Sequence, residues 1–308
     1  MGGFESNYLQ NRLVLSTIGE KMIYTIKNDK IEVQINTLGA ELTSAISSDG
    51  YEFIWQGKEW NKHSPVLFPI CGALLDGKYT FKGRDYLLGK HGFARDKKFT
   101  VKEANDTSVT LELISDSDTM QVYPFEFKLT AYFEINGNSL EARFTVENCG
   151  KQIMPYMFGW HPAFTLGGTR DISSFYVSFE GKKQLTRHTL QHGAFVNPFY
   201  TSYPLKAGKY YLNEEEIYSN DTMIFKDIPS VVKLAGGYQK RTVTLSYSEN
   251  LPYLCIWKAP VSEARYICIE PWSDVPSDGE TAENFLSRQM SRISPSETVD
   301  YCYTVTFD

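Results

Sequence analysis

The feature that most constrains the fold of this chain is a pair of long alternating segments joined by a two-residue turn. Residues 125–135 and 139–146 carry apolar side chains at every second position, the pattern of strands with one buried face. Between them lies Asn136-Gly137, a dipeptide that readily adopts the positive φ angles of a tight hairpin turn. The sequence therefore predicts a long antiparallel β-hairpin in the middle of the chain.

The rest of the chain repeats this pattern in shorter pieces. Apolar and aromatic segments alternate with turn residues, for example at residues 48–50, 76–77 and 82–83. The expected short strands are residues 23–26, 31–35, 51–55, 79–81, 109–113, 175–179, 231–234, 243–247, 253–257, 266–270 and 301–307. Aromatic residues make up 14% of the chain, which also favours strands because large rings pack well on a pleated surface.

Helical patterns are scarce. Apolar residues recur at helical spacing over residues 282–290, and residues 214–218 are expected to form at most a single turn. We therefore predict an all-β protein, a large antiparallel β-sandwich with very little helix, in which residues 22–308 form one domain. Residues 1–21 are expected to be an N-terminal extension that the fold does not require.

The composition excludes several classes of function. The formal net charge is −6 and no run of Lys and Arg supplies the basic face that nucleic-acid binding needs. No apolar segment approaches the length of a membrane span. The five cysteines are scattered without a Cys-x-x-Cys pair, which favours reduced thiols in a cytoplasmic protein. We expect no nucleic-acid or membrane partner, and a monomer or weak homodimer.

The apolar, aromatic segment of residues 153–164 contains the first candidate for chemistry. It predicts a buried strand, in which Met157, Gly159 and His161 share one face. An imidazole held between a tryptophan and a proline is well placed to transfer a proton. The alternative is a core histidine that is hydrogen-bonded to a neighbouring carbonyl group.

Two other polar positions stand out. In the loop 90–96, Gly92 lets the backbone turn while His91 and Arg95 project, although a solvated loop with an ion pair explains the same pattern. Glu270 ends an apolar strand just before Pro271, where burial would raise the pKa of its carboxyl toward neutrality and make it a base. A Glu paired at the end of a strand is the alternative.

Together these motifs resemble a known family. Residues 91–95 (His-Gly-Phe-Ala-Arg), 159–164 (Gly-Trp-His-Pro-Ala-Phe) and 268–272 (Cys-Ile-Glu-Pro-Trp) are similar, in this order, to signatures of the aldose 1-epimerases, or galactose mutarotase-like proteins. Residues 64–70 and 74–79 resemble the bacterial subgroup that contains the LacX-type proteins. The similarity runs from about residue 22 to the C-terminus.

This resemblance implies a galactose mutarotase-like β-supersandwich that binds a free hexose, such as galactose or glucose, in a groove and uses no cofactor. It implies that Glu270 is the general base at the C1 hydroxyl and that His161 is the general acid at the ring oxygen. His91 would hydrogen-bond the sugar near its reacting end and help to polarise it, and Asp221 would bind sugar hydroxyls. The remaining residues expected to contact the substrate are Arg95, Trp160 and Trp272.

One position departs from the family pattern. An Arg commonly follows the Phe-Pro-Ile-x-Gly segment of these proteins and binds the sugar, whereas this chain has Ala73. The activity would then depend on compensation by Arg95 or Lys258. A non-catalytic sugar-binding or sensory protein and a sugar-phosphate mutarotase remain alternatives.

A metal-dependent enzyme is a further alternative from another class, with His91, His161 and Glu270 as ligands. Their wide spacing, without a His-x-His or His-Glu-x-x-His motif, speaks against it. No nucleophile elbow or Gly-rich phosphate loop is present in the sequence either.

Overall fold

The predicted hairpin lies in the largest sheet of the protein. The computed structural model describes residues 16–18, 21–168, 171–191, 195–213, 215–217, 222–261 and 264–308. Strands β10 (Phe127–Asn136) and β11 (Ser139–Asn148) pair antiparallel without a break in register, and Gly137 takes a φ of 58° in the turn. The alternating burial along both strands confirms the predicted hairpin.

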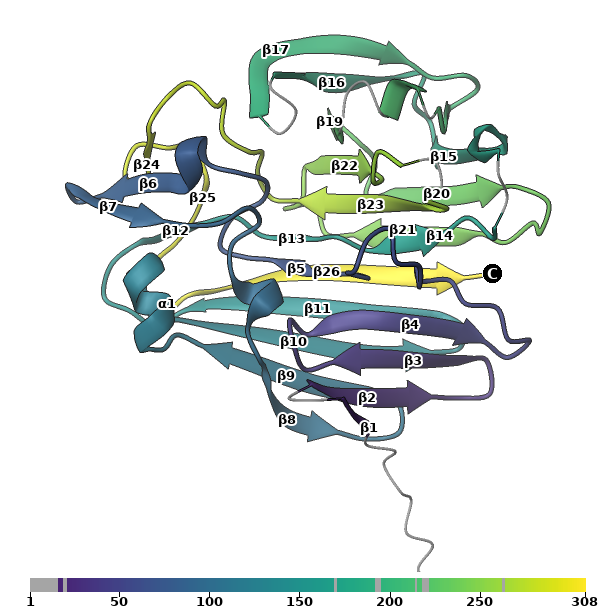
Figure 1. Ribbon diagram of the computed structural model, residues 1–308, viewed down its shortest axis with the longest axis horizontal. Coiled ribbons are helices and arrows are strands. Elements are labelled where there is room, and N and C mark those ends of the chain that lie inside the picture. The colour runs from purple at the N-terminus through teal and green to yellow at the C-terminus, as the bar shows by residue number, and fades with distance from the viewer. Residues whose placement is uncertain are drawn as a thin grey trace, which may run out of the picture.

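Among the described residues, nine strands form this sheet in the order β18-β15-β20-β21-β26-β11-β10-β9-β8. The bounds of the other seven are β18 (Lys209–Tyr211), β15 (Phe175–Phe179), β20 (Val231–Gly236), β21 (Val243–Tyr247), β26 (Thr298–Phe307), β9 (Ser108–Ile114) and β8 (Thr100–Ala104). In Figure 1, β26 crosses the middle of the molecule, with β11, β10, β9 and β8 below it. Neighbouring strands in this sheet are antiparallel, as predicted.

A second large sheet contains eight strands of the described chain, seven of them in the order β17-β16-β19-β22-β23-β13-β5, with β14 also paired to β23. Their bounds are β17 (Phe195–Pro204), β16 (Gln184–Gln191), β19 (Thr222–Lys226), β22 (Tyr253–Trp257), β23 (Tyr266–Trp272), β13 (Gly159–Trp160), β5 (Val66–Leu67) and β14 (Ala163–Thr165). β23 is buried along its whole length, since it lies in the middle of this sheet.

The two large sheets pack face to face. Phe144 of β11 and Tyr303 of β26 both contact the ring of Trp160, which β13 contributes from the other sheet. Further along, Phe179 of β15 contacts Phe225 of β19. These contacts between inward-facing side chains of two sheets define a β-sandwich, so the predicted fold class is confirmed.

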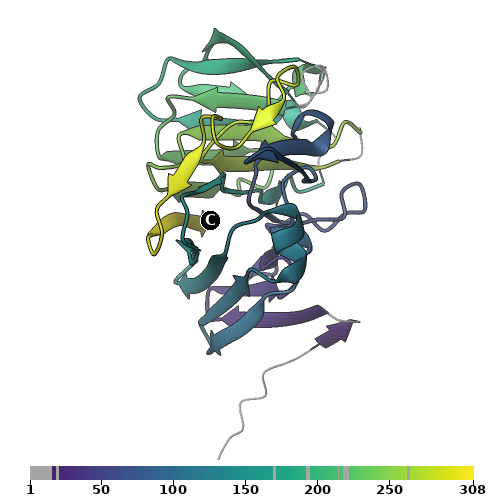
Figure 2. The ribbon, with the colours of Figure 1, turned by 90° about the vertical axis from the view of Figure 1, so that its left-hand side faces the viewer.

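Smaller elements complete the molecule (Figure 2). A four-stranded sheet contains β1 (Ser16–Ile18), β2 (Lys21–Lys27), β3 (Ile31–Asn36) and β4 (Glu41–Ser47). β12 (Met154–Tyr156) pairs with β25 (Ser291–Ile293), and β6 (Lys78–Phe81) lies between β7 (Arg84–Leu87) and β24 (Glu283–Asn284). The short helices of the described chain include α1 (Ser117–Val122), η1 (Leu75–Gly77), η2 (Ala94–Asp96) and η3 (Ile172–Ser174).

The prediction of a helix over residues 282–290 was wrong. This segment forms β24 and then a tight turn, in which the carbonyl of Asn284 accepts the N–H groups of Ser287 and Arg288. Phe285 stacks on Tyr79 with ring centroids 3.7 Å apart, whereas Leu286 is 53% exposed. The apolar side chains therefore do not share one buried face, although their spacing is helical.

Two other local expectations have mixed outcomes. Residues 153–164 are buried almost throughout, but they form three short strands, β12, β13 and β14, instead of one. Residues 215–217 are helical, in agreement with the expected single turn. Helix α1 was not predicted from the sequence; it begins with a capping box at Asp116. No helix among the described residues is long and apolar enough to cross a membrane.

Candidate active site

A cavity of about 180 Å³ lies against the eight-stranded sheet. It is on the face that points away from the nine-stranded sheet, because neighbours in a strand face opposite ways and Phe225, next to the cavity residue Ile224, points inward. The lining residues are Trp60, Gly72, Lys90, His91, Arg95, His161, Leu190, Thr222, Ile224, Cys255, Trp257, Glu270, Trp272 and Pro276. Its volume corresponds to about six water molecules, which suits one small polar ring.

Strand register explains how residues that are distant in the sequence come to line the cavity on the side of the sheet. Ile224, Cys255 and Glu270 are direct cross-strand partners on β19, β22 and β23. Partners that lie opposite each other in a sheet point to the same face, so all three side chains meet the cavity. The next row on that face consists of Thr222, Trp257 and Cys268.

An imidazole and a carboxyl group meet at the end of the first row. His161 Nε2 lies 3.1 Å from Glu270 Oε2, and both side chains are almost fully buried. The ring of Trp60 lies over that of His161, with centroids 4.9 Å apart. Glu270 Oε2 and His161 Nδ1 have no well-formed hydrogen bond within the described part of the chain. The two groups therefore face each other and the cavity, with capacity left to bind a further polar molecule.

Burial shifts both groups toward their neutral forms. Loss of hydration raises the pKa of Glu270 well above its ordinary value, against smaller opposing effects of the Cys255 thiol and the Lys90 charge. Loss of hydration lowers the pKa of His161 to about 3, and the charges of Lys90 and Arg95 add to this effect. The carboxyl therefore holds the proton that the pair shares, while the imidazole is free to accept it.

The backbone fixes His91 beside this pair. His91 has a φ of 66°, an uncommon conformation for a residue with a side chain, and its N–H donates to the Gly72 carbonyl at 2.7 Å. The Gly72 N–H in turn donates to His91 Nδ1 at 3.0 Å. Since Nδ1 accepts, the proton of the neutral ring is on Nε2, which makes His91 a hydrogen-bond donor. Burial lowers its pKa and keeps the ring neutral.

Two cations come from the same loop as His91. Lys90 and Arg95 both line the cavity, and Arg95 Nε lies 3.5 Å from Asp96 Oδ2. The positive charge of Lys90 lowers the pKa values of both His161 and Glu270. Lys90 was predicted from the sequence only as part of the loop 90–96 and not as a site residue.

Tryptophan side chains form part of the cavity wall, but only one of the two predicted tryptophans is among them. Trp272 lines the cavity and lies across Gly159, where an added Cβ would come within 2.5 Å of its ring. Trp60 and Trp257 supply the rest of the aromatic surface, with ring centroids 5.5 Å apart. Trp160 instead points into the core between the sheets, where its indole donates to the Ser64 carbonyl. The structure therefore does not bring Trp160 to the cavity.

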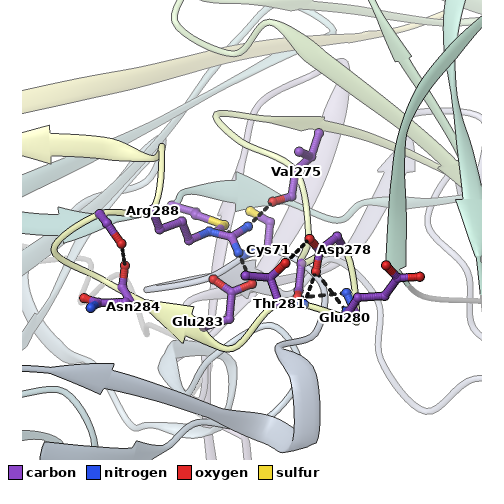
Figure 3. Close-up of polar contacts among 12 residues, drawn as sticks. Cys71, Val275, Asp278, Glu280, Thr281, Glu283, Asn284 and Arg288 are labelled. Carbon is purple, nitrogen blue, oxygen red and sulfur yellow. Dashed lines mark hydrogen bonds and ion pairs between the residues drawn. The ribbon is translucent and has the colours of Figure 1, made fainter. Parts of the chain in front are cut away.

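The loop of residues 273–288 carries the cavity residue Pro276. Figure 3 shows the polar contacts within this loop. The loop is held by its own polar contacts: Arg288 pairs with Glu283 and donates to the Val275 carbonyl at 2.8 Å. Further along, the Asp278 carboxylate accepts the N–H groups of residues 280 and 281. Pro276 packs on Gly72, and the Gly72 N–H is the group that orients His91. The loop therefore contacts the backbone that holds His91 in place.

The predicted residues are therefore mostly gathered in one place. His91, Arg95, His161, Glu270 and Trp272 line the same cavity, although they come from three separate parts of the sequence. Asp221 lies outside the described residues.

Of the two proposed substitutes for the missing Arg, Arg95 lines the cavity, whereas Lys258, like Ala73 itself, does not. Ala73 does not line the cavity; its carbonyl accepts the Ser277 N–H at 3.3 Å. Lys258 is buried and donates to the Val261 carbonyl, so it does not replace the missing Arg.

Several cavity residues were not predicted from the sequence. Cys255 and Trp257 alternate in the predicted strand 253–257, and that alternation shows that they share a face. The alternation does not show which strand pairs with strand β22. The pairing of β22 with β23 is what brings Cys255 and Trp257 close to Glu270. Trp60 and Pro276 lie in loops, where no periodicity identifies a role.

One group of side chains has the composition of a metal site. Among the described residues, His161, Cys268 and Glu270 each place one ligand atom within 4.8 Å of the other two. The sequence-based alternative had His91 as the third ligand, but the structure places Cys268 in that position. Nδ1 of His91 is already occupied by the Gly72 N–H.

Comparisons with known proteins point to one family. A family model described as aldose 1-epimerase matches residues 22–278. The chromosomal protein LacX of Lactococcus lactis subsp. lactis is 27% identical over 299 residues, which cover 92% of this chain and 99% of that protein.

Solved structures agree with this similarity. A galactose mutarotase related enzyme from Lactobacillus acidophilus superimposes with a TM-score of 0.87 at 29% identity, covering 93% of this chain and 97% of the other. A galactose mutarotase-like protein from Lactobacillus casei does so with a TM-score of 0.86 at 26% identity, covering 93% and 100%.

Proposed function

Because the chain belongs to the aldose 1-epimerase family, we propose that it interconverts the α and β anomers of a free hexose such as galactose or glucose. The observation that carries this proposal is the contact of 3.1 Å between His161 Nε2 and Glu270 Oε2 in a cavity of sugar-like size. Anomer exchange requires that one proton leaves the C1 hydroxyl and another reaches the ring oxygen. The buried pair holds one group for each transfer.

The reaction proceeds by opening and closing of the ring. Glu270 removes the proton from the C1 hydroxyl while His161 protonates the ring oxygen, so the C1–O5 bond breaks and C1 becomes an aldehyde. Rotation about the C1–C2 bond presents the other face of the aldehyde, and reversal of both proton transfers closes the ring as the opposite anomer. Each positioned acid or base typically contributes about 10²–10⁴-fold to the rate.

The starting protonation state requires that the shared proton moves from Glu270 to His161. Sugar hydroxyls that donate hydrogen bonds to the carboxyl group favour its ionised form, so binding lowers the pKa of Glu270. The short distance between the two groups lets the proton cross without a change in the net charge of the site. The bound sugar thus prepares the base and the acid together.

The remaining residues hold the sugar. His91 Nε2–H donates to a sugar oxygen near the reacting end, and Arg95 supplies the charged donor that Ala73 lacks. Trp272 provides an apolar wall for one face of the ring. Asp221 remains a proposed ligand of the sugar hydroxyls on the basis of the family resemblance alone. We further propose a cytoplasmic location, which is supported by five cysteines that are all unpaired.

The decisive test is the rate of anomer exchange. Purified protein is added to fresh α-galactose and α-glucose, and the approach to equilibrium is followed by polarimetry or NMR. We expect acceleration over buffer by the native chain, and its loss in Glu270→Gln, which keeps the shape of the side chain but cannot accept the proton. Sugar affinity should persist in that variant. Binding without acceleration by the native chain would favour a sensory or sugar-binding protein.

A sugar phosphate is a second candidate substrate, favoured by the two cations at the cavity. Lys90 and Arg95 line it together, and an anionic group on the sugar would pair with them. Glucose 6-phosphate and glucose in parallel assays distinguish the candidates, because a phosphate-directed site should show a lower KM for the former. Lys90→Gln should remove that preference while turnover of the neutral sugar continues.

A further inference from the structure

Two residues of the cavity wall, His161 and Glu270, lie next to a third potential metal ligand, Cys268. His161 offers an imidazole nitrogen, Cys268 a sulfur and Glu270 a carboxylate oxygen, and each of these atoms lies within 4.8 Å of the others. All three side chains are buried, and Glu270 Oε2 has no well-formed hydrogen bond in the described structure. A buried carboxylate oxygen without a well-formed hydrogen bond, beside an imidazole and a thiol, is an arrangement that a cation would satisfy.

The geometry of this group suits a tetrahedral ion. Zinc ligands lie about 2.0–2.3 Å from the metal, so a nitrogen and an oxygen bound to the same ion are about 3.3 Å apart. His161 Nε2 and Glu270 Oε2 are 3.1 Å apart. A sulfur and a nitrogen or oxygen bound to the same zinc ion are about 3.6 Å apart, so the sulfur of Cys268 must approach by at most about 1.2 Å.

We propose that this cavity also binds a thiophilic divalent cation, with zinc as the best fit, through His161 Nε2, Cys268 Sγ and Glu270 Oε2. On binding, the Cys268 thiol releases one proton and the His161–Glu270 pair releases its shared proton. The two negative charges of thiolate and carboxylate then balance the ion. A fourth position faces the cavity and takes water. The positive charges of Lys90 and Arg95 oppose binding and keep the affinity moderate.

The ion and a sugar cannot occupy the site together. The metal would bind the same nitrogen and oxygen atoms that the proposed proton transfers require, so zinc is expected to act as a competitive inhibitor. This consequence rests on the proposed mutarotase function, whereas metal binding itself does not.

Cobalt provides a test that is independent of activity. The full chain is titrated with Co²⁺, and we expect a thiolate-to-cobalt charge-transfer absorption that is absent in Cys268→Ser. Cys149→Ser, which removes an exposed thiol, is the matched control and should keep the absorption. Zn²⁺ titrated by calorimetry should bind Cys268→Ser at least about tenfold more weakly. Absorption that persists in Cys268→Ser, is lost in Cys255→Ser instead, or never appears would overturn the assignment.

A second measurement needs no variant, in case the substitution prevents folding. Excess galactose should suppress the cobalt absorption of the native chain, and Zn²⁺ should raise the KM for the sugar without changing kcat. Inhibition with an unchanged KM would overturn the competition. If the chain turns over no aldose, the cobalt titration still decides whether the metal site exists, so the two proposals fail separately.

Discussion

At the scale of single residues, the site depends on a carboxyl and an imidazole that have both been taken out of water. Glu270 has no exposed surface and His161 has very little, and loss of hydration drives their pKa values in opposite directions. A neutral pair that shares one proton is less costly to bury than two charges. It also holds the two groups that ring opening needs, with the proton close to both.

Cys255 is expected to orient the base. Its thiol donates to Glu270 Oε1 at 3.5 Å, which leaves Oε2 toward His161. Loss of such a bond is worth about 1 kcal/mol, so kcat should fall about fivefold in Cys255→Ala. Cys255→Ser retains a donor and should recover most of the rate, and the pH at half-maximal kcat should shift only in the alanine variant. Polarimetry over a pH series measures both. A native kcat in Cys255→Ala would contradict this role.

His188 is expected to make the fold sensitive to acid. It is buried between Tyr200 and Tyr253, with neither ring nitrogen hydrogen-bonded in the described structure, and burial together with the nearby Lys226 charge lowers its pKa to about 4. A His with a depressed pKa stabilises the fold above the unfolded value of about 6.5, and that stability is lost as the pH falls toward the folded value.

The measurement is unfolding by denaturant at pH 7.5 and pH 5. Between these values the His188 contribution should fall by about 2 kcal/mol. His188→Phe, which cannot be protonated, should reduce the difference in unfolding free energy between the two pH values by that amount. Other titrating groups are common to both proteins and cancel. An equal loss of stability in the two proteins would contradict the expected acid sensitivity.

At the scale of elements, the cavity is built where a sheet and two loops meet. Strands β19, β22 and β23 supply the floor, and their register determines which side chains become neighbours. The segment around Gly72, which is hydrogen-bonded to His91, and the loop of residues 273–288 supply the sides of the cavity, and they meet where Pro276 packs on Gly72. The shape of the cavity therefore depends on how closely these two segments approach each other.

Gly72 is expected to be the position in this contact where a substitution disturbs the cavity most. Its φ is +72°, and an added Cβ would lie 2.3 Å from Pro276 Cγ. Gly83 has a φ of +76° and open space around it, so Gly83→Ala measures the cost of the backbone conformation alone, about 1–2 kcal/mol. Gly72→Ala should cost about 1–3 kcal/mol more and raise the KM for the sugar. Thermal melts and polarimetry measure the two effects. Equal melting temperatures for the two variants would show that the loop accommodates the methyl group.

At the scale of the whole molecule, a chain with a negative net charge has a cavity that is lined by two cations. The net charge is −6, while Lys90 and Arg95 both line the cavity. The two large sheets provide the rigid support, because Trp160 anchors the strand next to His161 in the core between them. The four-stranded sheet is a separate layer in which β1 lies at the edge. We propose that the chain functions as a monomer or weak homodimer.

Residues 1–21 are expected to be dispensable. Of this segment, β1 pairs only with β2 within the described structure, and none of its described residues lines the cavity. A chain that begins at Met22 should keep its sugar turnover and melt within a few degrees of the full chain, because a three-residue edge strand contributes little. Circular dichroism and polarimetry measure these properties, and size exclusion reports whether the newly exposed edge of β2 causes association. Loss of folding or turnover would contradict the expectation.

The sequence alone determined the fold class, since alternation along the chain and turn residues such as Asn136-Gly137 are local signals with a period of two. It also identified His91, His161 and Glu270, because polar residues stand out in apolar surroundings and match the motifs of a family. Local periodicity failed over residues 282–290, where burial of Phe285 against Tyr79 outweighed helical spacing.

Only the tertiary structure decided which strands are neighbours and in what register. That pairing places Cys255 opposite Glu270, brings Cys268 to the same group and directs Trp160 into the core, away from the cavity. Pairing between distant strands depends on the burial of both sheets at once, so no pattern within a single strand contains it. The same holds for the contact of Pro276 with Gly72, which two loops create only after the sheets have formed.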